Sequence, residues 1–299
     1  MIATEHQFSC VIPTHRRADF LVEAVESVLR QSLLPIEVIV VSDTVDGETE
    51  EACRRLSTSS AVPVRLVVYA DTPGGASESR NRGARAASGE YLAFLDDDDT
   101  WGPDYLQDAA AAFESQQADV VVTWISMFRG EQLKDGPAIR DGLSPRDVVA
   151  VNAGTIGSNM VVRRSAFDAV GGFDPALRMK NDTDFFYRFL KAGNRYAAVQ
   201  KRSVFQRKHE SGQLTGHSGA RADHTERYLE KHRADLTAAD RRQLRFVIHR
   251  IRRNSSSSRA ARAYHLAMSL LHYSPQQYLK DRANRNDRDF FTVPSIERD

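Results

Sequence analysis

Short apolar runs alternate with helical patterns from residue 7 to about residue 128, and this alternation restricts the folds available to the chain. Five apolar runs have the length of strands: "FSCVIPT", "IEVIVVSD", "PVRLVVYAD", "EYLAFLD" and "DVVVTWISMF". The segments between them carry helical patterns, and Asp19 is the expected N-cap of the first helix. Strands separated by helices of this length predict parallel βαβ units in an open α/β sheet that helices cover on both faces.

Length and composition are those of an ordinary globular protein. The chain has 299 residues, 41% of them hydrophobic, which is enough for one large domain or two modest ones. Its 41 Lys and Arg balance 40 Asp and Glu, so the net charge of +1 names no partner. Cys10 and Cys53 are too few for a disulfide framework or a cysteine-rich zinc site. The N-terminus lacks a signal-peptide pattern and no segment approaches the ~18 apolar residues of a membrane span, which predicts a cytoplasmic protein.

Polar residues, most of them acidic, end four successive strands of the predicted sheet. The strand ends are Thr14-His15, Ser42-Asp43, Ala70-Asp71 and the run from Asp96 to Asp99. The carboxyl ends of parallel strands meet at one edge of an open sheet, and ligands bind in the crevice outside that edge. Adjacent carboxylates repel each other unless a cation lies among them. The run therefore predicts a cation-dependent site; the alternative is a solvated turn in which Asp99 caps the next helix.

A divalent metal ion together with a diphosphate fits this acidic edge. Mg²⁺ and Mn²⁺ take oxygen ligands, and Mg²⁺ is usually held by one or two carboxylates and by substrate phosphates. The segment "PGGASESRNRG" supplies a Gly74-Gly75 turn followed by Arg80 and Arg82 as donors for phosphate. The segment matches neither a phosphate-binding Walker loop nor a dinucleotide fingerprint.

Five separated motifs occur in the order and spacing of a known family: "VIPTHRR", "EVIVVSD", "SRNRGARAASGEYLAFLDDDDTWGPDYL", "GGFDPAL" and "NDTDFFYRFLKAG". Over about residues 8–215 the chain resembles the family 2 glycosyltransferases, which have the GT-A fold. The resemblance implies a Rossmann-like, mostly parallel open sheet. It also implies an inverting enzyme that moves a sugar from a nucleoside-diphosphate sugar, most often a UDP-sugar, to a glycan or another acceptor hydroxyl, with Mn²⁺ or Mg²⁺ as cofactor.

The nucleoside part of the donor is assigned by this resemblance to the first two strand ends. Pro13 and Thr14 are expected to line the nucleoside pocket, and Asp43 is expected to contact the base. The family usually has Asp-Asp-Gly-Ser after the second strand, whereas this chain has Ser42 to Val45, so a different loop shape is expected.

The diphosphate and the metal ion are assigned by the same resemblance to the acidic run. Arg80 falls on the arginine that approaches the nucleotide, and Asp96 and Asp98 form the Asp-x-Asp motif of the family. Asp97 is expected near the ribose, and Asp98 is the expected direct metal ligand.

The segment "FQRKHESGQLT" resembles the histidine-containing segment that follows the last core strand in the family. His209 is expected to bind the metal ion or the diphosphate, and Arg207 or Lys208 to neutralise phosphate. Residues 211–215 are expected to order when the donor binds.

Asp182 is the catalytic base that the resemblance implies in the acceptor half. The family usually has Glu-Asp at this place, whereas this chain has Asn181-Asp182, so the glutamate is missing while the base position is kept. On the residues alone, Asp182 is also interpreted as the cap of the helix that begins there. Backbone donors at a helix N-terminus would hold the carboxylate ionised near neutrality.

The predicted domains are a glycosyltransferase domain, residues 1–219, and a helical extension, residues 220–299. The first domain divides into a donor half, about 1–128, and an acceptor half, about 129–219. The extension carries arginines around an apolar stripe, and a packed, solvated appendage is the favoured interpretation. A homodimer contact and a basic surface for an anionic membrane are the alternatives. No nucleic-acid partner is expected, because the acidic edge repels phosphate without a metal ion.

Two other functions compete with sugar transfer. A nucleotidyltransferase also places metal-binding carboxylates at strand ends, but "VIPTHRRADF" lacks the basic, glycine-rich signature with its lysine. A glycosyltransferase-like binding module without turnover has Asn181 as its only support, and Asp182 and the intact aspartate run argue against it.

Overall fold

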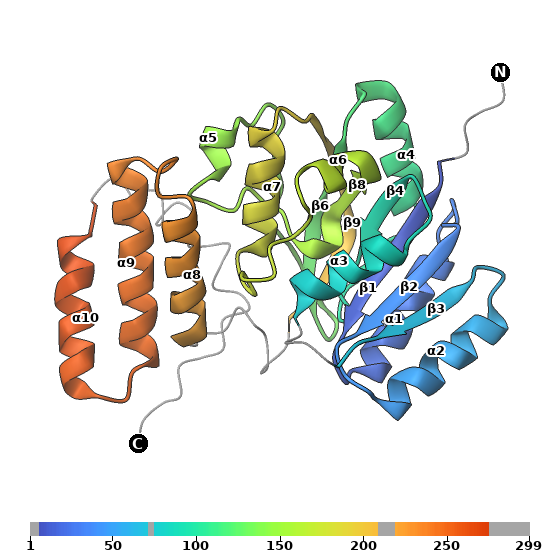
Figure 1. Ribbon diagram of the computed structural model, residues 1–299, viewed down its shortest axis with the longest axis horizontal. Coiled ribbons are helices and arrows are strands. Elements are labelled where there is room, and N and C mark those ends of the chain that lie inside the picture. Colours follow the sequence, from blue (N-terminus) through green and yellow to red (C-terminus); the bar gives the residue numbers. More distant parts are fainter. Residues whose placement is uncertain (1–5, 71–74, 209–218, 275–299) are drawn as a thin grey trace. The chain divides into compact units, whose positions relative to one another are not determined.

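The computed structural model of the chain describes residues 6–70, 75–208 and 219–274 (Figure 1). The chain divides into two compact units. The first unit comprises residues 1–128 and 133–207, and the second comprises residues 129–132 and 208–299.

Within the described residues, nine strands form one mixed sheet, most of it in the first unit. The strands are β1 (Phe8–Thr14), β2 (Glu37–Ser42), β3 (Val64–Val68), β4 (Tyr91–Phe94), β5 (Thr100–Trp101), β6 (Val120–Arg129), β7 (Gln132–Asp135), β8 (Met160–Arg163) and β9 (Tyr196–Arg207). Their order is β3-β2-β1-β4-β8-β6-β9-β5, with β7 paired to β6. Along this order, neighbours run parallel except around β8 and between β5 and β9. The prediction of a mostly parallel open sheet is confirmed.

Helices cover both faces of this sheet. They are α1 (Ala18–Leu29), α2 (Gly47–Ser59), α3 (Ala76–Ala86), α4 (Tyr105–Gln116), α5 (Pro145–Val148), α6 (Arg164–Ala169) and α7 (Asn181–Lys191), with a 3₁₀ turn at Gly157–Asn159. Successive side chains of a strand point to opposite faces. Cys10 and Ile12 of β1 therefore join the core formed with α1, α2 and α4. Val11 faces α3 on the other side, where a Cβ at Gly83 would lie 2.2 Å from its Cγ1.

Two helix caps differ from the prediction. The N-cap of α1 is Arg17, whose side chain makes no cap bond, and Asp19 lies in the first turn of the helix. The N-cap of α4 is Asp104, because the two-residue strand β5 separates Asp99 from that helix. The prediction that Asp99 caps the helix is wrong, and its buried carboxylate has partners elsewhere.

The second unit contains three helices within the described residues, α8 (Gly219–Lys231), α9 (Ala238–Ser255) and α10 (Arg259–Leu271). The central helix α9 contacts both others and buries Leu244, Ile248 and Ile251. The predicted helical character of the C-terminal region is confirmed. In the described part of the chain, no helix combines the length and the apolar character that a membrane crossing requires.

Candidate active site

The acidic edge forms where β1 and β4 end side by side in parallel register (Figure 1). Thr14, the last residue of β1, donates a hydrogen bond of 2.7 Å from its hydroxyl to Asp97 Oδ2. Asp97 is only 6% exposed, and burial raises its pKa to about 6 against the opposing effect of the Thr14 hydrogen bond. The structure thus brings together two residues that the resemblance assigns to the nucleoside.

Arg17 supplies a positive charge inside the aspartate run. Its Nη1 lies 3.0 Å from Asp98 Oδ2 and 3.4 Å from Asp97 Oδ1. Sequence reasoning missed this contact, although Arg17 stands three residues after the strand end, in the motif "VIPTHRR". Arg17 therefore already neutralises part of the negative charge of the aspartate run.

Ser158 and Arg207 fix the backbone of the aspartate run. The Ser158 hydroxyl donates to Asp99 Oδ2 over 2.6 Å and accepts the Asp96 N–H over 3.1 Å. The N–H of Arg207 donates to Asp99 Oδ1 over 3.0 Å, and its Nε donates to the carbonyl of Asp98 over 3.1 Å. Burial, and then repulsion from Asp98 and Asp96, raises the pKa of Asp99 well above its ordinary value. Asp99 therefore holds the loop in shape.

Arg80 lies between the carboxylates of the two halves of the unit. Its guanidinium forms an ion pair with Asp96 and lies 3.8 Å, Nη1 to Oδ1, from Asp182. The Arg80 side chain is only 3% exposed, and its Nε and Nη1 make no hydrogen bond to any described residue. A Cβ at Gly157 would lie 2.1 Å from Arg80 Nη2, so any other residue at that position would displace the guanidinium. The guanidinium carbon also lies over the ring of Phe173, 5.2 Å from its centroid.

Asp182 lies in the first turn of α7, whose N-cap is Lys180, so its interpretation as a cap is wrong. Its side chain keeps 21% of its surface exposed, while Oδ1 is buried and makes no hydrogen bond within the described residues. Burial raises the pKa of Asp182 to about 6, Arg80 opposes this shift, and Asp96 reinforces it. The carboxylate can therefore lose its proton just below neutral pH.

Asn181 positions the start of α7. Its Oδ1 accepts the N–H of Asp182 over 2.8 Å, and its Nδ2 donates to the Ser77 hydroxyl of α3 over 3.0 Å. The Ser77 hydroxyl in turn donates to the carbonyl of Leu177. Asn181 is buried, and it replaces the family's glutamate with a residue that needs no counter-charge.

Three further side chains support Phe173 and the start of α7. Asn81 of α3 exchanges two hydrogen bonds with the backbone of Phe173, of 2.7 and 2.9 Å, and so fixes the ring beside Arg80. Arg188 pairs with the buried Asp184 at 2.8 Å and donates to the carbonyls of Val170 and Gly172. Asp184 and Arg188 therefore hold α7 to the preceding turn.

The other assigned residues lie at the same edge or outside the described residues. His15 Nδ1 and Asp43 Oδ1 are 2.5 Å apart, which joins the ends of β1 and β2. Pro13 is buried within β1 opposite Val41. His209 and residues 211–215 are outside the described part of the chain.

The carboxylate oxygens of the aspartate run suit a hard divalent cation whose remaining ligands come from a substrate. In the described residues, no group of three or more His, Cys, Asp or Glu side chains is arranged to hold a metal ion. Asp96 and Asp98 offer carboxylate oxygens, and one or two such ligands with substrate phosphates are what Mg²⁺ commonly takes. Mutual repulsion helps to raise the pKa of Asp97 and of Asp99, so an added cation would relieve a charge excess that the structure contains.

Comparison with protein families gives two matches. The model described as "Glycosyl transferase family 2" matches residues 9–171, and the model described as "Glycosyl transferase family group 2" matches residues 91–276. An uncharacterized glycosyltransferase, YwdF of Bacillus subtilis, is 26% identical over 231 residues, which are 76% of this chain and 84% of that protein. A glucosyl-dolichyl phosphate glucuronosyltransferase of Haloferax volcanii is 29% identical over 190 residues, and the match covers 58% of each chain.

Two solved structures share the fold. TarS 1–349 of S. aureus in complex with UDP-GlcNAc superposes with a TM-score of 0.61 at 18% identity, covering 95% of this chain and 76% of TarS 1–349. The mannosyltransferase PcManGT of Pyrobaculum calidifontis in complex with GDP-Man and Mn²⁺ gives a TM-score of 0.61 at 19% identity, with coverages of 95% and 88%. The likeness confirms the predicted GT-A fold.

Proposed function

The chain belongs to glycosyl transferase family 2, and on that premise we propose that it moves a sugar, with inversion, from a nucleoside-diphosphate sugar to an acceptor hydroxyl. The observation that carries the proposal is the placement of Arg80 between Asp96 of the donor half and Asp182 of the acceptor half. Asp182 is the proposed base. Family membership favours sugar transfer over nucleotidyl transfer. Asn181, the only support for an inactive module, has a positioning role of its own in the structure.

The proposed donor is a UDP-sugar held at the ends of β1, β2 and β4. Pro13 and Thr14 are proposed at the nucleoside, with Asp97 at the ribose, which the Thr14–Asp97 hydrogen bond supports. Asp43, steadied by His15, is proposed at the base. Solved relatives in fold carry UDP-GlcNAc or GDP-Man, which supports the donor class.

Asp98, together with Asp96, is proposed to hold Mn²⁺ or Mg²⁺ against the donor diphosphate, and His209 remains a predicted further ligand. The ion when bound supplies positive charge to the departing diphosphate. The presence of Mn²⁺ in the PcManGT complex is consistent with this cofactor.

Asp182 is the proposed proton acceptor, and neighbouring side chains keep it ionised and in place. Asp182 would accept the proton of the acceptor hydroxyl as the new carbon–oxygen bond forms at the anomeric carbon and the bond to the diphosphate breaks. Arg80 favours the ionised form of Asp182, which must be unprotonated to act as a base. Asn181 and Ser77 fix the turn that presents the carboxylate.

Asp98→Ala is expected to abolish metal-dependent donor binding. Titration calorimetry of a panel of nucleoside diphosphates, with and without Mn²⁺, measures this for the wild type and the variant. One nucleotide should bind the wild type in a metal-dependent manner, and that binding should disappear in Asp98→Ala. The matched control is Asp168→Ala, which removes an exposed carboxylate of α6. Equal binding to wild type and Asp98→Ala would remove Asp98 from the metal site, and no binding by folded wild type would leave the aspartate run a structural feature.

The acid limb of the pH–rate profile is expected near pH 6, because burial raises the pKa of Asp182 to about 6. A base must be unprotonated, so kcat/KM should fall about ten-fold per pH unit below this value and level off above it. Initial rates at saturating metal from about pH 5 to about pH 8 measure the limb. The pKa of Asp97 is also raised to about 6, and that of Asp99 is raised well above its ordinary value, so Asp97→Asn and Asp99→Asn variants that both keep the limb assign it to Asp182. A flat profile through this range would contradict the proposed base.

A further inference from the structure

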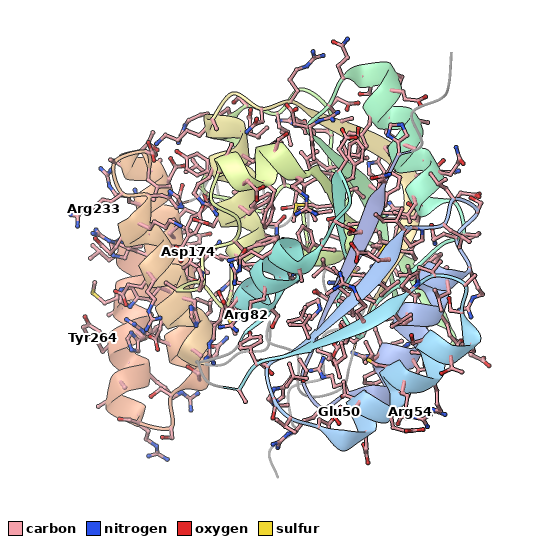
Figure 2. All side chains as sticks on the ribbon, turned by 45° about the vertical axis from the view of Figure 1, so that its right-hand side comes forward. Glu50, Arg54, Arg82, Asp174, Arg233 and Tyr264 are labelled. Carbon is pink, nitrogen blue, oxygen red and sulfur yellow. The ribbon has the colours of Figure 1, made fainter. Side chains whose placement is uncertain are left out.

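The outer face of α10 is apolar and exposed. Its large side chains are Tyr264, Leu266, Leu270 and Leu271, which keep 57%, 42%, 67% and 65% of their surface exposed (Figure 2 labels Tyr264). Exposed alanines extend the same face at Ala260, Ala263 and Ala267. At helical spacing these seven positions share one side of the helix, while Ser269 is buried on the other. We call this surface the α10 face. A contiguous exposed apolar patch of this kind marks an interaction surface.

Basic side chains adjoin the α10 face. Residues 238–271 contain eight arginines and a single acidic residue, Asp240. Asp240 forms the capping box of α9 with Thr237. An open hollow of about 500 Å³ is lined by Ala238, Arg241, Arg242, Arg245, Leu271 and His272. Because Leu271 belongs both to this basic hollow and to the α10 face, the two features are continuous.

We propose that the α10 face and the basic hollow together bind a membrane surface of anionic phospholipids. The apolar side chains would lie at the boundary between headgroups and acyl chains, with the helix parallel to the membrane plane. The arginines would contact lipid phosphates, which the planar guanidinium matches better than an ammonium group does. At 13 residues, α10 is too short to cross the bilayer. The proposal goes beyond sugar transfer and does not depend on it.

A second copy of this chain is a poorer occupant of the α10 face. Residues 238–271 of each copy carry eight arginines and one acidic residue, so pairing two such faces would set a basic surface against a basic surface, and like charges across an interface are unfavourable. An anionic lipid surface complements the same arginines, each of which attracts it electrostatically. Charge therefore favours a lipid surface over a homodimer at this place.

Cosedimentation of the full chain with vesicles tests the proposal. The vesicles are phosphatidylcholine alone or phosphatidylcholine with phosphatidylglycerol. Leu270→Glu/Leu271→Glu should lower partitioning into the anionic vesicles by at least about a hundred-fold, because two leucines that the membrane would bury are lost and negative charge is added. Arg245→Ala should lower it about five-fold. The matched controls are Leu133→Glu, at a position 61% exposed on β7, and Arg54→Ala on α2, and both should bind as the wild type does.

The wild type should bind only the anionic vesicles, and binding should weaken as salt rises from about 0.05 M to about 1 M. Three results would overturn the proposal. One is no binding to either vesicle, and another is equal, salt-independent binding to both. The third is a dimer, seen by light scattering without vesicles, that Leu270→Glu/Leu271→Glu dissociates, because the α10 face would then be a contact between copies.

Discussion

Asp182→Asn is expected to reduce turnover by about 10²–10⁴-fold while leaving donor binding largely unchanged. The amide keeps the shape of the carboxylate but cannot take the acceptor proton. The bond from the Asp182 N–H to Asn181 is made by the backbone, so the first turn of α7 is retained in the variant. Asp182 makes no side-chain hydrogen bond through Oδ1 to any described residue, which limits the structural cost of the change.

Two measurements on the same variant separate catalysis from binding. Release of nucleoside diphosphate from the nucleotide-sugar reports turnover, and titration calorimetry reports donor affinity. Asp168→Asn is the matched control, because it makes the same chemical change at an exposed position on α6 and should be as active as the wild type. If donor affinity falls in Asp182→Asn as far as turnover does, the carboxylate belongs to the donor site and the division of roles proposed above is wrong.

The sheet edge could be predicted because its signals are local. The apolar runs of β1 and β2 bury their side chains, and the polar residues at their carboxyl ends, Thr14 within β1 and Asp43 just after β2, lie at the edge of the sheet. The parallel direction of β3, β2, β1 and β4 then follows from the helices between successive strands. The position of β8 could not be predicted in this way. It inserts antiparallel between β4 and β6, and only pairing between distant segments determines that.

The supporting residues of the site were missed for the same reason. Ser158 is 59 residues from Asp99 in the chain, and no spacing rule connects a serine to an aspartate at that distance. Gly157 is an ordinary turn residue in the sequence, and its role appears only when the Arg80 guanidinium lies against it. At Asp99 a local pattern was misleading. Its closeness in sequence to the next helix predicts a cap, but that helix begins farther along the chain, with Asp104 as its N-cap.

In the helices of the second unit, the spacing of apolar residues predicts the helices but not whether their apolar faces are buried. Arginines around an apolar stripe predict a helix, and α9 and α10 both form. The pattern also predicts that the apolar stripe is buried, and Leu244 and Ile248 of α9 are indeed buried. On α10 the large apolar residues Leu270 and Leu271 are exposed instead. A hydrophobic face on a helix therefore indicates that the face needs a partner, and the partner need not belong to the same unit.

Arg80→Met is expected to lower the free energy of unfolding by about 3 kcal/mol near neutral pH, the lower end of the cost of breaking a buried ion pair. The lower end applies because Asp96 keeps 31% of its side chain exposed, although Arg80 itself is 3% exposed. Methionine fills part of the volume without charge, so Asp96 and Asp182 lose their shared partner. Denaturant titration measures the change. Arg85→Met on the same helix is the control, because this 63% exposed arginine pairs with Glu78 at the surface and should cost less than about 1 kcal/mol.

The pH dependence of this loss identifies its cause. Arg80 lowers the pKa of Asp182, so the pKa should rise above about 6 in Arg80→Met. A carboxylate whose pKa is higher in the folded than in the unfolded state destabilises the fold as pH rises through that folded pKa, and the penalty disappears when both states are protonated. Below about 6 Asp182 is protonated in both folded proteins, so its contribution to the deficit of Arg80→Met relative to wild type should be level there. The deficit should therefore shrink as the pH falls from about 8 to about 6. A deficit that stays constant across this range would mean that Arg80 stabilises the fold by packing against Phe173 and Gly157 instead of by holding the two carboxylates together.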